Sequence, residues 1–278
     1  MIAMQDTMNH KMTTDELVER YKQYADRLQR YYNQYIDILE SEYNKAMKNV
    51  VREELSSGSD MALGFYNPSP VLDLVVGNVH RGKILKRITN RSKPDTKYGF
   101  GADGRMVAFS VIRDEPVRGG VHGFVTYDGN SATYLQFQKW HEILDVDWIM
   151  QTEYDITGKL TCFTEVLFIG DTCSEMRQEI YTYNEEYMTH YIMWDCVPIS
   201  EDQMDEVLSW CEPSERFNSA INARLAKRAE ELKRTRHMVR QDLYLLQHDK
   251  DGFFTGYTVP DSYFPEHIYE ITPSRRKV

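Results

Sequence analysis

The stretch TEYDITGKLTCFTEVLF, residues 152–168, decides how this chain folds. From residue 160 onward its side chains fall into two alternating sets, as they do in an extended strand with one side facing a core. One set is Leu160, Cys162, Thr164, Val166 and Phe168, and the other is Thr161, Phe163, Glu165 and Leu167. Just before this strand, Asp155 precedes a Thr-Gly pair, and an Asp side chain can cap its own turn. The stretch therefore predicts a β-hairpin.

The same design recurs along the chain. It is found in YGFGADGRMVAFSV (98–111), YDGNSATYLQF (127–137) and YTYNEEYMTHYIMW (181–194). The turn positions Asp103, Asp128, Asp155 and Asn184 are separated by 25, 27 and 29 residues, about one hairpin with its connector. A catalytic loop is normally unique in a chain, whereas a structural device recurs. We therefore expect an antiparallel meander of repeated hairpins, in which the Asp of each Tyr-Asp pair serves its turn.

A long helix is predicted near the N-terminus. Residues 13–16 read Thr-Thr-Asp-Glu, the pattern of a capping box, and an apolar stripe with heptad spacing follows. The stripe consists of Leu17, Tyr21, Tyr24, Leu28, Tyr31, Tyr35 and Ile38. Four of these seven residues are Tyr, whose hydroxyls need partners, so packing on the chain's own sheet or on a wet interface is favoured over a dry zipper. We expect this helix to end near residue 55.

Two further regions flank the hairpins. Residues 71–79 and 84–89 are rich in β-formers and predict strands. Beyond the hairpins, a capping box at 200–203 predicts a short helix that Pro213 ends, and a longer helix is predicted over about 214–248. Between residues 214 and 240 this helix carries eight Lys or Arg against three Glu, and pairing with the chain's own acids is favoured over binding to nucleic acid.

These elements predict an α+β fold with a long N-terminal helix, an antiparallel β-meander and C-terminal helices. The expected segments are a helical segment 1–59, a β-sheet region 60–197, and helices with an irregular tail over 198–278, together forming one compact unit. With 278 residues, of which 41% are hydrophobic, the chain can bury a substantial core.

Composition narrows the class of protein. The net charge is -10, which disfavours nucleic acid and favours a basic partner. No signal peptide or apolar run of membrane-spanning length is visible, so a cytoplasmic protein without membrane contact is expected. The four cysteines stand singly, 11, 23 and 15 residues apart, and no nucleotide-binding, nucleophile or metal motif occurs. We therefore expect no metal and no cofactor.

Aromatic and acidic residues in and around the hairpins are the best candidates for a partner-binding surface, because aromatic anchors and complementary charge are typical of interfaces. The candidates are Trp140, Glu142, Asp145 and Asp147, together with Tyr134, Tyr154 and Tyr183. The alternative is an enzyme that uses carboxylates among the turns for acid and base work. Its candidates are Glu142, Asp145, Asp147, Glu153 and Asp155.

The segments YDITGKLTCF and YDGNSATYLQF resemble the hairpins of YD-repeat proteins. With the flanking helices, the chain looks like immunity proteins encoded beside bacterial polymorphic toxins. The resemblance covers about residues 83–196 and departs from the repeat at 184–186, where the turn glycine is absent. It implies a protein that neutralises a cognate toxin by occluding its active site, with no toxin-binding residue assigned. A scaffold protein that dimerises through the Tyr-rich helix is a third hypothesis, and the oligomeric state is left open.

Overall fold

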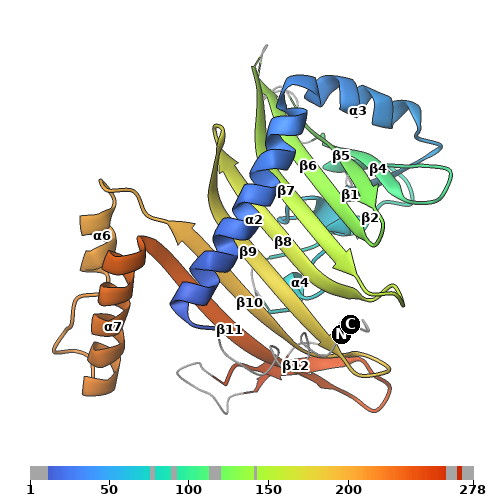
Figure 1. Cartoon of the computed structure of the whole chain (residues 1–278). Coiled ribbons are helices and arrows are strands. Elements are labelled where there is room, and N and C mark those ends of the chain that lie inside the picture. Colours follow the sequence, from blue (N-terminus) through green and yellow to red (C-terminus); the bar gives the residue numbers. More distant parts are fainter. Residues whose placement is uncertain are drawn as a thin grey trace.

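The computed structural model describes residues 12–75, 79–88, 93–112, 120–140, 143–260 and 268–270. These residues form one antiparallel sheet of thirteen strands in the order β13-β12-β11-β10-β9-β8-β7-β6-β5-β4-β3-β1-β2. The strands are β1 Arg52–Ser57, β2 Lys83–Ile84, β3 Thr96–Phe100, β4 Met106–Val111, β5 Val121–Asp128, β6 Ser131–Trp140, β7 Ile143–Tyr154, β8 Leu160–Ile169, β9 Thr172–Tyr183, β10 Met188–Pro198, β11 His237–His248, β12 Phe254–Thr258 and β13 Tyr269–Glu270. The predicted meander is confirmed, because β3 to β13 lie side by side in chain order (Figure 1).

The turns at Asp155 and Asn184 are built as predicted, whereas in the turn after β5 the Asp128 carbonyl oxygen, not its carboxylate, accepts a hydrogen bond from the Ser131 hydroxyl at 2.9 Å. The Asp155 carboxylate accepts hydrogen bonds from the N–H groups of Thr157, at 2.8 Å, and Lys159, at 3.0 Å. The Asn184 side-chain oxygen likewise accepts hydrogen bonds from the N–H groups of Glu186 and Tyr187, each at 2.8 Å. These hydrogen bonds hold each turn from within, without any contribution from a ligand.

A fifth hairpin of the same kind lies where the sequence predicts an irregular tail. The Asp249 carboxylate accepts N–H groups from Asp251 and Phe253 at 2.9 Å, in the turn that joins β11 to β12. The repeat is hidden in the sequence because two helices are inserted between the fourth hairpin and this one.

The N-terminal helix is confirmed in part. α2 spans Thr14–Tyr35, a 3-10 turn η2 follows over Ile36–Ile38, and α3 spans Leu39–Lys48. The capping box is present, with the Thr13 N–H 2.7 Å from a Glu16 carboxylate oxygen. The expected end near residue 55 is wrong, because β1 begins at Arg52 and pairs with β3 and β2. The backbone N–H and C=O groups of the six β1 residues gain hydrogen-bond partners within the sheet, and this outweighs the local helical pattern.

The helix stripe packs on the chain's own sheet. Leu17, Tyr21 and Leu28 are buried in a core cluster with residues of β6 to β10. The rings of Tyr32 and Phe168 are stacked with their centroids 4.9 Å apart, and the Tyr31 hydroxyl lies 2.8 Å from that of Thr126. The tyrosines therefore place their rings in the core and find polar partners on the sheet.

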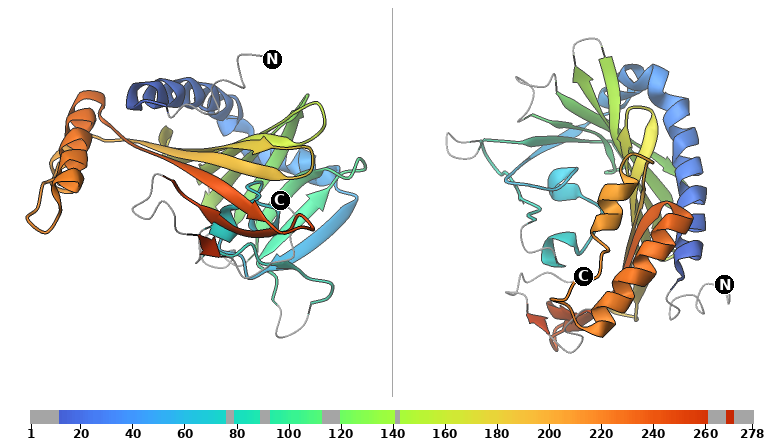
Figure 2. Two further views of the ribbon diagram at one scale, coloured as in Figure 1. Left: turned by 90° about the horizontal axis from the view of Figure 1, so that it is seen from below. Right: turned by 90° about the vertical axis from the view of Figure 1, so that its left-hand side faces the viewer.

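The sheet is curved, with a different covering on each face. α2 crosses the outer face, whereas the residues between β1 and β2 lie against the inner face (Figure 2). We call residues 59–75 and 79–82 the inner strap; it contains the 3-10 turn η3, Gly64–Tyr66, and the short helix α4, Leu72–Val75. The predicted strand over 71–79 is wrong, since α4 occupies its first half and residues 76–78 lie outside the described part. Of the predicted strand 84–89, Ile84 is in β2 and residue 89 lies outside the described part.

The C-terminal helices are shorter than expected. α6 spans Met204–Ser209, and α7 spans Ser219–Thr235. The helix predicted to reach residue 248 is wrong beyond Arg236, whose φ of 57° ends α7. The following residues form β11, which pairs with β10 from His237 to Leu245. Apolar residues expected on one helix face, such as Val239, instead lie in a strand, because the free edge of β10 needs a hydrogen-bonding partner. Among the described residues, no helix is long and apolar enough to cross a membrane.

Candidate functional site

Five hairpin turns gather at one end of the sheet. Turns that follow alternate strands of a meander lie on the same side, and here they follow β3, β5, β7, β9 and β11. We call residues 101–105, 127–131, 154–159, 183–187 and 248–253 the hairpin rim. The rim contains seven carboxylates and three basic side chains, a net charge of -4 out of -10 for the whole chain. It is therefore an acidic surface built from hairpin turns, four of which are capped by their own Asp or Asn side chain.

Tyrosines line an open groove in the rim. The groove has a volume of about 540 Å³ and lies between the turns after β3, β5 and β7. Its lining includes Arg105, Tyr127, Tyr134, Tyr154 and Ile156. The Tyr127 ring is 37% exposed, and its hydroxyl donates to the Met106 carbonyl oxygen at 2.8 Å. The Arg105 guanidinium lies 5.0 Å from the centroid of this ring, in cation–π geometry.

Ile156 is the apolar tip of the groove. Its side chain is 94% exposed at the centre of the turn between β7 and β8. The turn does not require an apolar residue there, because Asp155, Thr157 and Lys159 make its hydrogen bonds. An exposed isoleucine beside tyrosines, surrounded by charges, is the arrangement expected at a contact surface.

Two of the predicted tyrosines meet in the groove and the third lies nearby. Tyr134 is buried and forms the floor, and Tyr154 lies on the neighbouring strand. Burial, followed by the charges of Asp155 and Tyr154, raises the pKa of Tyr183 to about 12. The Lys159 ammonium lies 5.3 Å from the centroid of the Tyr183 ring. The Tyr183 hydroxyl is therefore a neutral hydrogen-bonding group at physiological pH.

The predicted acidic candidates do not form one surface. Asp145 is exposed near the start of β7, far from the rim, and Asp147 faces the inner side, where it accepts a hydrogen bond from Gln138 at 2.8 Å. The backbone of Trp140 is opposite that of Ile143, and Glu142 lies outside the described residues. A strand of twelve residues extends about 40 Å, so candidates at the start of β7 lie far from the rim turn that follows its other end.

The carboxylates suggested for acid and base work are also separated. Glu153 lies on the outer face, 3.3 Å from the Arg27 guanidinium of α2. Hydrogen bonds from Thr157 and Lys159 lower the pKa of Asp155, the opposite of what a general acid requires. These two carboxylates therefore have structural partners and do not face one another.

A charged ladder on the inner face was missed by the sequence prediction. Glu165, Arg177, Asp195 and Arg240 lie directly opposite one another across β8, β9, β10 and β11. Arg177 contacts Glu165 at 2.5 Å and Glu179 at 3.5 Å. Burial raises the pKa of Asp195 to about 6, and burial also raises the pKa of Glu165 despite Arg177. The alternation of charged residues with apolar ones in β8 and β9 is visible in the sequence, but their register is not.

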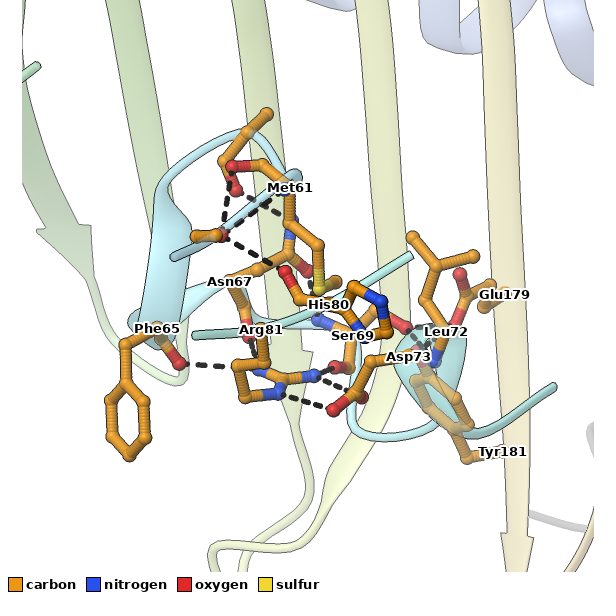
Figure 3. Close-up of polar contacts among 12 residues, drawn as sticks. Met61, Phe65, Asn67, Ser69, Leu72, Asp73, His80, Arg81, Glu179 and Tyr181 are labelled. Atoms are coloured by element: carbon orange, nitrogen blue, oxygen red, sulfur yellow. Dashed lines mark hydrogen bonds and ion pairs between the residues drawn. The ribbon is translucent and has the colours of Figure 1, made fainter. Parts of the chain in front are cut away.

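Glu179 connects this ladder to the inner strap. The side chain is fully buried, and one carboxylate oxygen accepts hydrogen bonds from the hydroxyls of Ser69, at 2.7 Å, and Tyr181, at 2.6 Å. Within the strap, the Arg81 guanidinium donates to the carbonyl oxygens of Asn67 and Ser69 and contacts the Asp73 carboxylate (Figure 3). Arg81 therefore shapes the strap, while Ser69 attaches it to the sheet.

The cysteine side chains and the possible metal ligands of the described residues do not form a reactive site. The four cysteines are unpaired and buried, and burial raises the pKa of Cys162 and Cys196 to about 12. The described part of the chain contains no group of three or more His, Cys, Asp or Glu side chains that could hold a metal ion.

Comparison with models of known protein families and with curated proteins finds no match to this chain. Its proposed function therefore depends on its own sequence and geometry.

Proposed function

We propose that this chain is a cytoplasmic protein-binding module that docks a basic partner on the hairpin rim. In its specific form, the proposal is an immunity protein that neutralises a bacterial toxin by covering the toxin's active site. The observation that carries the proposal is the composition of the rim, where the exposed Ile156 and Tyr127 are surrounded by a net charge of -4.

The chemistry of the rim suits a protein partner. Tyrosine is enriched among the residues that dominate binding energy, because it buries a large ring and keeps a hydroxyl for hydrogen bonding. The surrounding acids would attract a basic partner over a distance and accelerate its association. The Tyr127 ring and the Ile156 side chain would then provide the apolar contact.

The rim is also rigid before a partner arrives. Asp155, Asn184 and Asp249 cap their own turns, and each turn is continuous with long paired strands. Little conformational freedom would be lost on binding, so more of the contact energy would appear as affinity. A preformed surface of this kind is well suited to blocking an active site.

The proposed toxin partner is supported by the sequence resemblance, which lies in the hairpins that form the rim. The segments YDITGKLTCF and YDGNSATYLQF contain the turns that include Ile156 and Tyr127. An enzyme among the same turns has less support, because Asp155 is engaged as a turn cap.

The proposal is tested with the purified chain and the protein encoded beside its own gene. We expect a stable complex and loss of the neighbour's toxic activity. In the complex, amide hydrogen exchange should slow at turns 101–105, 127–131 and 154–159, and not at the turn between β8 and β9 at the other end of the sheet. The proposal fails if no neighbouring gene product binds, or if protection appears away from the rim.

A further inference from the structure

A second groove lies on the inner face of the sheet. It has a volume of about 440 Å³, within the range of roughly 300 to 1,000 Å³ of small-molecule sites. The first residues of the inner strap, including Met61, form one wall, and three residues directly opposite one another in the sheet, Gln136, Trp148 and Leu167, form the floor. The groove lies toward the end of β8 opposite the hairpin rim, so it is separate from the proposed docking surface.

Gln136 is the unexplained residue in this groove. Its side chain is only 8% exposed, yet it has no hydrogen-bond partner within the described part of the chain. Amides in enclosed positions are nearly always paired with protein or with water, so this amide is left to bind water or a ligand in the groove. The amide borders the groove, so a molecule bound there would supply the missing partner.

The neighbouring amide is held in one orientation. Gln138 donates from Nε2 to the Asp147 carboxylate at 2.8 Å, which leaves its Oε1 as an acceptor. The floor therefore offers two amide oxygens beside the ring of the half-buried Trp148. An aromatic ring next to several acceptors favours a flat ligand that is rich in N–H donors.

The charge of the lining favours a cation. The described residues that line the groove include Asp60, Asp95 and Asp147 and contain no Lys, Arg or His. Asp95 accepts hydrogen bonds from the N–H groups of Gly58 and Ser59, so it secures the wall. Asp60 is exposed at the margin, where its charge can steer a cation into the groove.

We propose that the inner groove binds the guanidinium group of a small molecule. A guanidinium is planar, carries five N–H donors and stacks on aromatic rings, so it matches the ring of Trp148 and the oxygens of Gln136 and Gln138. A compact ammonium group would use fewer of these acceptors and would not stack.

The test is a calorimetric titration of the intact chain with N-acetylarginine amide and, as a matched neutral probe, N-acetylcitrulline amide. These two molecules differ in the guanidinium, which citrulline replaces with an uncharged urea group. We expect the arginine probe to bind at least about tenfold more tightly than the citrulline probe, since hydrogen bonds to a charged group are stronger than neutral ones. Equal affinities, or no binding of the arginine probe, would overturn the proposal.

Two variants place the probe in the groove. Gln136→Leu should weaken arginine binding by about tenfold, and it should keep the fold because the Gln136 side chain makes no hydrogen bond within the described part of the chain. Should Gln136→Leu fail to fold, Asp60→Asn at the exposed margin should still weaken binding by about threefold, whereas Asp205→Asn on α6 should not. Unchanged binding in folded Gln136→Leu, or equal effects of the two Asp→Asn changes, would show that the probe binds elsewhere.

Discussion

The hydroxyl of Ser69 donates a 2.7 Å hydrogen bond to the buried carboxylate of Glu179, which lies 110 residues later in the chain. This contact joins the inner strap to the middle of the sheet, and the same hydroxyl accepts the Leu72 N–H at the start of α4. One side chain thus positions the strap and starts its short helix.

Replacing Ser69 by Ala should lower the free energy of unfolding by about 1 to 3 kcal/mol, because Glu179 loses one of its donors in a fully buried site. Urea denaturation measures the change. Ser209→Ala, which removes an exposed hydrogen bond in α6, is the matched control and should change stability by no more than about 0.5 kcal/mol. Equal effects of the two changes would mean that the strap is not held by Ser69.

Arg177 is expected to be the least replaceable residue of the charged ladder. Arg177→Met leaves Glu165 and Glu179 without their shared counter-charge in a buried site, so a loss of about 3 to 5 kcal/mol is expected. Adding Glu165→Gln should recover part of this loss, since it removes one of the unpaired charges. A double-mutant cycle in urea measures the coupling, and purely additive effects would contradict the ladder.

Stability should depend on pH through Asp195. Burial raises the pKa of its carboxyl group from 3.8 to about 6, so the folded chain holds this proton more tightly than the unfolded chain. The contribution of Asp195 to stability is therefore fully present below about pH 3.8 and is lost as the pH rises through about 6.

Asp195→Asn removes this titration. Relative to the parent, the variant should gain stability as the pH rises from about 4 to about 7, measured by urea denaturation at several pH values. Asp205→Asn on the exposed face of α6 supplies the baseline. A difference between Asp195→Asn and the parent that is constant over this range, or that falls, would show that the pKa of Asp195 is not raised.

The hairpins could be predicted because their signal is local. Asp155 and Asn184 form hydrogen bonds within four residues of themselves, so a short stretch of sequence is enough to predict the turn. The capping box of α2 is local in the same way, with Thr13 and Glu16 three residues apart. Both predictions are confirmed.

The elements that were missed depend on distant partners. Val239 fits a helical stripe, yet it forms a strand because Cys196 on β10 lies opposite it. The inner strap depends on Glu179, and no local pattern in residues 71–79 reveals that contact. Local propensity is a weak guide wherever the backbone can pair with an open sheet edge.

In the candidate site, too, local features could be predicted and features that depend on distant contacts could not. Tyr134 and Tyr154 lie in one groove because each is close to a turn at the same end of the sheet. Asp145 and Asp147 are not part of this groove, because they lie near the start of β7, at the end of the strand opposite the rim. Gln136 itself has no sequence signal, because only the fold shows that its amide borders the inner groove.

The central claim, that the hairpin rim docks a protein partner, is tested most directly at the two ends of β8. Ile156, in the turn before β8, is 94% exposed, and Ile169, the last residue of β8, is 69% exposed, so Ile156→Asn and Ile169→Asn are the same change on the rim and away from it. The measurement is the affinity of each variant for the protein encoded beside the gene. We predict about five- to tenfold weaker binding for Ile156→Asn, as for an interface anchor, and an unchanged affinity for Ile169→Asn, with equal stability of both variants in urea. Undiminished binding of Ile156→Asn, or a loss seen only for Ile169→Asn, would contradict the claim.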